Sequence, residues 1–195
     1  MSVHDKGGNN LLLMPKLQFR WRVTFTNFGS SGVAKPLTRQ AIDMTRPQMK
    51  FTEVPVHIYN TMAYLQGKPN WEPITLKLRD DSQSELSEEI ALQLQCQLDY
   101  QDFSSGKAGI DYKFKTHIDV LDGNNGTAPE VLETWNLYGC YLQSANYDAI
   151  NYATSDSMTV SLSIRFDNAS QYSKDGGDND LSSAGRVQRV DGNTA

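Results

Sequence analysis

The chain has 195 residues, 38% hydrophobic and 21% charged, a length that suits one globular domain better than two large ones. Its net charge of −5 disfavours a sequence-independent nucleic-acid binder, because such proteins neutralise phosphates with an excess of lysine and arginine. Apolar runs such as Leu11–Met14 are far shorter than the about 20 residues that cross a membrane, and shorter than a signal-peptide core. We therefore expect neither a membrane anchor nor a secretory leader.

Composition divides the chain into three segments. Residues 1–16 form a Gly- and Asn-containing N-terminal extension, and residues 17–172 form the folded domain. Residues 173–195 contain isolated aliphatic residues and no aromatic one. Such a segment cannot bury enough apolar surface to fold alone, so we predict a flexible C-terminal tail.

Alternation of apolar and polar residues predicts β-strands along most of the domain. The predicted strands are, in chain order, 17–26, 49–59, 74–79, 112–120, 135–141 and 157–166. Pro55 places 49–59 at a sheet edge or bulge, and the Gly67–Asn70 stretch is predicted to be a turn. We expect a mainly β protein with one helix, folded as an antiparallel β-barrel or sandwich of about six strands.

One helix is predicted between the third and fourth of these strands, over residues 82–98. Ser82 followed by Glu85 has the spacing of a capping box, and Leu86 and Ile90 begin an apolar series at every fourth position. The preceding pair Asp80–Asp81 could serve acid–base chemistry. At the start of a helix, capping and compensation of the helix dipole are the stronger interpretation of these carboxylates.

The sequence offers little support for catalysis or for a cofactor. His4, His57 and His117 are far apart and lack metal-binding spacing, so we expect no metal site. Cys96 and Cys140 lie outside any nucleophile signature and are interpreted as packing residues; whether they are ever bridged stays open. We therefore expect no catalytic residues and no cofactor.

Charge is distributed unevenly over the predicted strands. Their polar faces carry seven basic residues against one acid, Asp119, whereas most acids lie on the helix and in loops. This pattern suits pairing between copies of the chain, although solvated surface and protection of sheet edges would produce it too. The candidate intersubunit charge pairs are Arg20, Arg22, Lys77, Arg79, Lys113, Lys115 and Arg165.

Three stretches together resemble the tail tube proteins of contractile-tailed bacteriophages. Residues 59–81 are similar to the family's hairpin, Gly-x-x-x-Trp turn, strand and acidic helix start. Residues 135–142 and 157–167 are similar to its C-terminal strands, and the likeness covers about residues 17–170.

The resemblance implies a structural subunit whose sheets close, in hexameric rings, into one large β-barrel around a channel. Rings would stack into a tube inside a contractile sheath, and DNA would pass through the lumen without specific binding. Implied partners are further copies, the sheath protein, the tape measure protein, the baseplate hub and the tail terminator. The implied location is the virion tail, assembled in the host cytoplasm.

The resemblance also suggests roles for two elements. The helix is expected on the outer wall, and the hairpin from Thr52 to Asn70 is expected to make ring-to-ring contacts. The candidate contact residues are Thr52, Glu53, His57, Tyr59, Asn60, Tyr64, Lys68 and Asn70.

Alternatives stay open at this point. Within the same assembly class, the chain could be a baseplate tube initiator or the tube of a phage-derived contractile injection system. In another class, a β-sandwich carbohydrate-binding module would use exposed aromatic residues, with Trp71 and Tyr138 as candidates.

Overall fold

The computed structural model describes residues 16–29, 35–105, 112–122, 129–153 and 155–173. These residues form antiparallel strands and one helix, which confirms the predicted fold class. The elements are β1 (Trp21–Thr26), β2 (Lys35–Pro36), β3 (Ala41–Met44), β4 (Met49–Ile58), β5 (Thr61–Trp71), β6 (Ile74–Arg79), α1 (Glu85–Gln97), β7 (Phe114–Leu121), β8 (Val131–Tyr147), β9 (Thr159–Arg165) and β10 (Asn168–Ser173). The described part therefore has ten strands, more than the six predicted.

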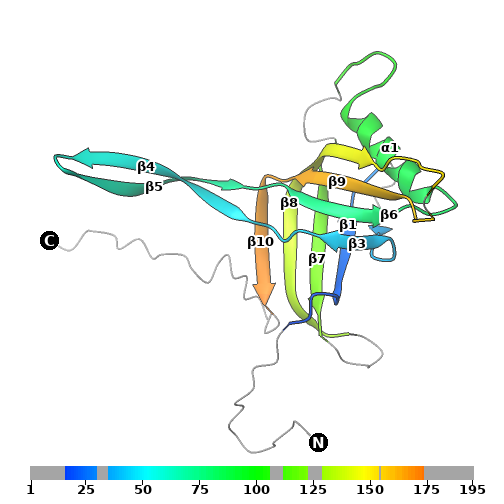
Figure 1. The fold of residues 1–195 in the computed structure, drawn as a ribbon, viewed down its shortest axis with the longest axis horizontal. Coiled ribbons are helices and arrows are strands. Elements are labelled where there is room, and N and C mark those ends of the chain that lie inside the picture. Colours follow the sequence, from blue (N-terminus) through cyan, green and yellow to red (C-terminus); the bar gives the residue numbers. More distant parts are fainter. Residues whose placement is uncertain (1–15, 30–34, 106–111, 123–128, 154, 174–195) are drawn as a thin grey trace, which may run out of the picture.

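Two sheets share the long strand β8, as Figure 1 shows. In the first sheet the strand order is β2-β1-β7-β8-β10, and in the second it is β8-β9-β6-β3. The bend lies where β8 passes from one sheet to the other, at Gly139, which has a φ of 66°. A Cβ at this glycine would also clash with the Asp167 carboxylate. The sheet does not close on itself within one subunit.

The core lies between the two sheets, with α1 across one end (Figure 1). The rings of Phe25, Phe28 and Phe114 pack against one another with centroids 5.0 to 5.5 Å apart. Leu86 and Ile90 of α1 are buried in the same core, as the predicted helical periodicity requires. Core positions alternate along β6 and β9, which confirms the predicted two-residue period there.

The ends of several predicted strands are wrong: 112–120 begins only at Phe114, and 135–141 is the middle of the longer strand β8. The first strand begins only at Trp21, and Leu17 and Phe19 are 43% and 73% exposed at the open end of the first sheet. Met158, which precedes β9, is 56% exposed. In both places the alternation of apolar and polar residues continues beyond the end of the strand, where the apolar side chains are exposed.

The predicted capping box at Ser82 and Glu85 does not form. The helix begins at Glu85, and its N-cap residue Ser84 has a φ of 58° and no side-chain capping hydrogen bond. Asp81 takes this role, because its Oδ1 accepts a hydrogen bond from the Glu85 amide at 3.2 Å. The preference for acids at this helix end stands.

The predicted extension 1–16 and tail 173–195 fall almost entirely outside the described residues. Both cysteines are free; Cys140 is buried, but Cys96 is exposed on α1, so its predicted packing role is wrong. Within the described part, no helix is long and apolar enough to cross a membrane. The same residues contain no group of His, Cys, Asp or Glu that could hold a metal ion.

Candidate assembly surfaces

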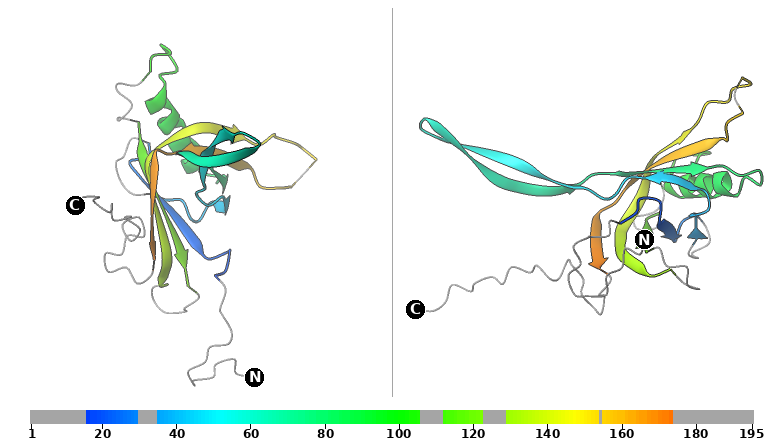
Figure 2. Two further views of the ribbon diagram at one scale, coloured as in Figure 1. Left: turned by 90° about the vertical axis from the view of Figure 1, so that its left-hand side faces the viewer. Right: turned by 60° about the horizontal axis from the view of Figure 1, so that its bottom comes forward.

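The most prominent surface feature is the hairpin formed by β4 and β5. It projects away from the two sheets, as Figure 1 and the right-hand view of Figure 2 show. The strands have 10 and 11 residues and form a two-stranded sheet of their own. Every residue of β4 is exposed. An isolated two-stranded hairpin is at best marginally stable in water, so contact with another surface would stabilise this one.

One face of the hairpin is aliphatic. The strand register places Val54 opposite Leu65 and Val56 opposite Ala63, with Ile58 on the same face at the tip. The four larger side chains are between 37% and 58% exposed. We call Val54, Val56, Ile58, Ala63 and Leu65 the aliphatic face; its exposed apolar area is typical of an interaction surface.

The opposite face of the hairpin is mixed. Glu53 lies opposite Gln66, Pro55 opposite Tyr64, and His57 opposite Met62. All eight predicted ring-to-ring residues are exposed on this hairpin, but none belongs to the aliphatic face. Sequence reasoning therefore selected polar and aromatic positions and missed the aliphatic ones. The spacing of Val54, Val56 and Ile58 was the signal that could have identified them.

The predicted turn at Gly67–Asn70 is wrong, because these residues lie inside β5. The register with β4 shifts by one residue there, so the strand carries a bulge. A Cβ at Gly67 would lie 2.6 Å from the Thr52 carbonyl oxygen. Glycine is therefore required at position 67, because the two backbones approach each other closely there. The bulge itself increases the twist of the hairpin.

The face of the first sheet that points away from the core is polar; we call it the outer face. The registers of β1, β7, β8 and β10 show that it contains no aliphatic side chain between Lys115 and Asp119 of β7 and beside them. Its members are Arg22, Thr24, Thr26, Lys115, His117, Asp119, Thr134, Asn136, Tyr138, Asn168, Ser170 and Tyr172. A polar sheet face of this extent suits contact with water.

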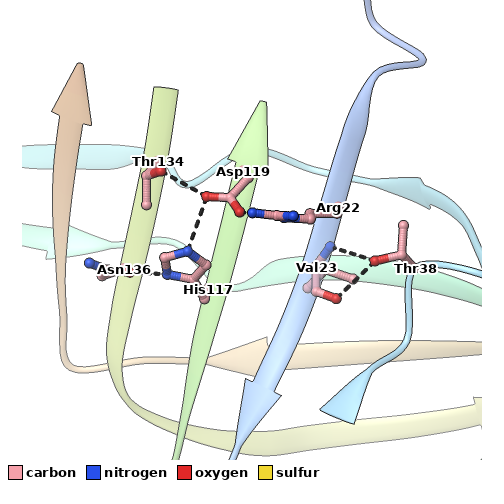
Figure 3. A network of polar contacts seen from close by, with 7 residues as sticks. All are labelled: Arg22, Val23, Thr38, His117, Asp119, Thr134 and Asn136. Carbon is pink, nitrogen blue, oxygen red and sulfur yellow. Dashed lines mark hydrogen bonds and ion pairs between the residues drawn. The ribbon is translucent and has the colours of Figure 1, made fainter. Parts of the chain in front are cut away.

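A network of polar contacts centred on Asp119 lies on this face (Figure 3). The carboxylate is 1% exposed and accepts hydrogen bonds from Arg22 Nε at 2.6 Å and Thr134 Oγ1 at 2.7 Å. His117 Nε2 lies 3.0 Å from the same carboxylate, and its Nδ1 contacts Asn136 Oδ1. Both imidazole nitrogens thus face oxygen atoms, an arrangement that favours the doubly protonated ring.

The electrostatics of the network follow from these contacts. Burial alone would raise the pKa of Asp119, but hydrogen bonds from His117, Thr134 and Arg22 outweigh it and hold this pKa well below its usual range. The hydrogen bond to Asp119 raises the pKa of His117, against the opposing effect of burial. The positive charge of Arg22 is therefore matched within its own subunit.

Two of the predicted intersubunit charge-pair residues also have an acidic partner within their own subunit. Arg22 pairs with Asp119, and Lys113 Nζ lies 2.5 Å from Asp167 Oδ2. Arg165 donates a hydrogen bond to Asn70 at the base of the hairpin, at 2.7 Å. As intersubunit contacts, all seven candidates stay predictions.

A second buried carboxylate fixes the beginning of the described chain to the first sheet. Glu133 is 3% exposed and accepts hydrogen bonds from Arg46 Nη2 at 2.5 Å, Trp135 Nε1 at 2.6 Å and Gln171 Nε2 at 2.8 Å, and it pairs with Lys16. Burial alone would raise the pKa of Glu133, but the hydrogen bond from Lys16 and the other donors lower it to about 2. A cavity of about 360 Å³ opens beside this cluster.

The two residues considered for sugar stacking, Trp71 and Tyr138, lie in different parts of the structure. Trp71 is half-buried at the base of the hairpin, with its ring 5.5 Å from that of Phe166. Tyr138 lies on the outer face near Lys115, whose Nζ is 6.0 Å from the ring centroid. The two candidate stacking residues therefore have different surroundings, and Trp71 contributes to packing.

This geometry defines a class of fold: two antiparallel sheets sharing one bent strand, one helix, and a long projecting hairpin. Comparison with solved structures finds the same fold in tube components of contractile injection systems. A chain of the anti-feeding prophage cap, the AFP tube terminating cap, is similar with a TM-score of 0.60 and 14% identity, over 86% of this chain and 97% of that chain. A chain of the sheath–tube complex of the PVC extracellular contractile injection system in its extended state is similar with a TM-score of 0.57 and 14% identity, over 82% of this chain and 92% of that chain.

A third similar structure is the sheath/tube terminator of the same PVC system, with a TM-score of 0.58 and 14% identity, over 83% of this chain and 99% of that chain. No protein-family model and no curated protein matches the sequence. At these identities the likeness establishes the shared fold. The structural resemblance to contractile tail tube proteins that the sequence predicted is confirmed.

Proposed function

We propose that this protein is a structural subunit of the tube of a contractile injection apparatus, in which rings of the subunit stack to make a hollow conduit. The observation that carries the proposal is the projecting hairpin with its exposed aliphatic face. A free subunit gains nothing from this surface, whereas a polymer of identical subunits can cover every copy of it.

The finer parts of the proposal follow the resemblance. Each ring has six copies, a contractile sheath surrounds the tube, and DNA passes along the channel. Tape measure, baseplate hub and tail terminator proteins contact the ends or the interior, and the assembly is part of a virion tail. The helix α1 faces outward, and the hairpin contacts a neighbouring ring.

A separate observation supports a second candidate function, that of a component that ends or starts the tube. Two of the similar structures are a tube terminating cap and a sheath/tube terminator, components that end a tube instead of extending it. A terminator or a baseplate tube initiator with this fold would form single rings. The tube of a phage-derived injection system with another cargo would form stacked rings as well.

Electron microscopy of the purified protein tests the proposal directly. We expect stacked rings or long hollow tubes when the protein is concentrated at moderate salt. Single rings that never stack would favour the terminator or initiator. Monomers under all concentrations would contradict the proposal and would make a glycan-binding screen the next step.

A further inference from the structure

The cavity of about 360 Å³ lies between the two sheets, at the end where β1, β7 and β8 extend beyond the second sheet (Figure 1). The registers of these strands place Trp21, Val120 and Trp135 on the side that faces the core, but all three are only half-buried. The walls of the cavity are mainly apolar and include Trp21, Met44, Pro47, Ile118, Val120 and Trp135. One subunit therefore contains an apolar space that its described residues do not fill.

The charged residues around the cavity disfavour a small anion as its occupant. Lys16 and Arg46, two of the cations that line it, both pair with Glu133. Asp43 also lines the cavity and would repel a negative charge. An anion would have to compete with Glu133 for its cations, whereas an uncharged apolar occupant leaves these pairs intact.

The chain itself contains a segment of this kind. Leu11–Met14 is the longest uninterrupted apolar run in the sequence, and it lies outside the described residues. The described chain begins at Lys16, which lines the cavity. Because an extended chain spans at most about 3.6 Å per residue, the Cα atom of Leu13 is no more than about 11 Å from that of Lys16. The apolar run is thus tethered within reach of the cavity.

We propose that Leu11–Met14 dock in the cavity of their own subunit, and that the ion pair between Lys16 and Glu133 holds the segment there. The docked side chains would cover apolar walls that otherwise contact water. The inference concerns a single subunit and does not depend on the proposed ring.

Two further considerations favour this occupant. A cavity of about 150 Å³ holds one benzene molecule, so a cavity of about 360 Å³ has room for about two leucine side chains. A short tether gives the segment an effective concentration in the millimolar range, which favours its own cavity over the same cavity in another copy.

Fluorescence can report on the occupant, because two of the three tryptophans line the cavity. The third, Trp71, lies at the base of the hairpin against Phe166. Trp71→Phe is therefore introduced into every protein compared, so that Trp21 and Trp135 give the whole tryptophan signal.

The first test removes the apolar character of the segment in the full chain. Leu11→Gln, Leu12→Gln and Leu13→Gln are combined in one variant, and Asn9→Gln with Asn10→Gln is the matched control next to the run. We expect the emission of the triple variant to shift to longer wavelength and acrylamide to quench it more strongly, with the control unchanged. Equal emission and equal quenching in the triple variant and the control would overturn the inference.

The second test asks which subunit's cavity the segment occupies. Met44→Cys places a thiol on the cavity wall, and Leu12→Cys or Leu13→Cys, made in turn, samples both sides of the segment. Cys96→Ser removes the exposed native thiol from the background. After mild oxidation we expect a disulfide within single chains, with a yield independent of protein concentration, identified by peptide mapping under non-reducing conditions. Disulfides only between chains, or no disulfide from either position, would overturn docking in the same subunit.

Discussion

The role of the aliphatic face can be tested by comparing two adjacent residues of β5, because adjacent residues of a strand point to opposite sides. Leu65 and Tyr64 are 58% and 62% exposed, so either can be replaced without disturbing the core. Leu65→Asp places a charge on the aliphatic face, and Tyr64→Asp places the same charge on the mixed face. Neither substitution touches the two sheets, so we expect the melting temperature of the monomer to stay unchanged in both variants.

The size of the effect follows from the exposed area. Full burial of a leucine side chain contributes about 1.5 to 3 kcal/mol. Leu65 retains 58% of its exposure, so burial in an interface is worth about 1 to 2 kcal/mol for each subunit. An unpaired aspartate in the same place adds a desolvation cost of at least similar size. Since about 1.4 kcal/mol is a factor of ten, we expect the critical concentration for tubes to rise at least about tenfold.

Sedimentation of tubes over a range of concentrations measures this quantity, and micrographs of the pellet identify what has formed. Tyr64→Asp should shift the critical concentration less than Leu65→Asp does. The reverse order, with Leu65→Asp assembling normally and Tyr64→Asp failing, would refute our reasoning and return the contact to the polar and aromatic positions that the sequence predicted.

Three further predictions concern the folded subunit and its charges. The lowered pKa of Glu133 contributes stability that is fully present above about pH 5 and is lost as the pH falls toward 2. We therefore expect Glu133→Gln to be less stable than the unmodified protein at neutral pH. Its melting temperature should also change less as the pH is lowered from about 5 to about 2. Gly139→Val should reduce the yield of folded protein, since the bend in β8 needs a positive φ and leaves no room for a Cβ, and circular dichroism would show this. Arg79→Glu, on an exposed position of β6, should leave the melting temperature unchanged but block assembly in the sedimentation assay; normal tubes would exclude Arg79 from the intersubunit pairs.

The elements that sequence patterns predicted best are those with a second layer above them. β6 coincides with the predicted strand 74–79, and its alternate residues Ile74, Leu76 and Leu78 are all buried. Where the covering layer ends, the same pattern was misleading, as at Phe19, whose alternation suggested a buried face. Periodicity reports which side chains share a face, but only the fold decides whether anything covers that face.

The hairpin illustrates a different limit. Pro55 and the Gly-Lys-Pro stretch at 67–69 suggested an interrupted strand and a turn, because both residue types usually end regular structure. In the structure the two strands run past these residues, and a bulge at Gly67 accommodates the extra residue. A hairpin that pairs with nothing else has free outer edges on both strands, so a proline whose nitrogen faces such an edge removes no ladder hydrogen bond. This reasoning needs the topology, which the sequence does not contain.

The buried position of Asp119 changes what the outer face can do if it lines the channel. Sequence alone placed seven basic residues on polar strand faces, a surface that would hold phosphates. Asp119 forms an ion pair with Arg22, so the fixed charge of this arginine is compensated within its own subunit (Figure 3). An arginine whose charge is compensated in this way binds the phosphates of a passing polyanion less strongly.

Asp119→Asn tests this argument, because it leaves Arg22 without its counter-charge while keeping a hydrogen-bonding side chain of the same shape. We expect assembled rings of the variant to retain a labelled DNA oligonucleotide at low salt and to release it as salt is raised, whereas unmodified rings retain little. Electrophoretic mobility shift at several salt concentrations measures the difference. Arg22→Gln in the same background removes the unmatched cation and should abolish the retention. Equal DNA retention by unmodified and Asp119→Asn rings would mean that the outer face does not meet the nucleic acid, and that the channel wall is formed by another surface.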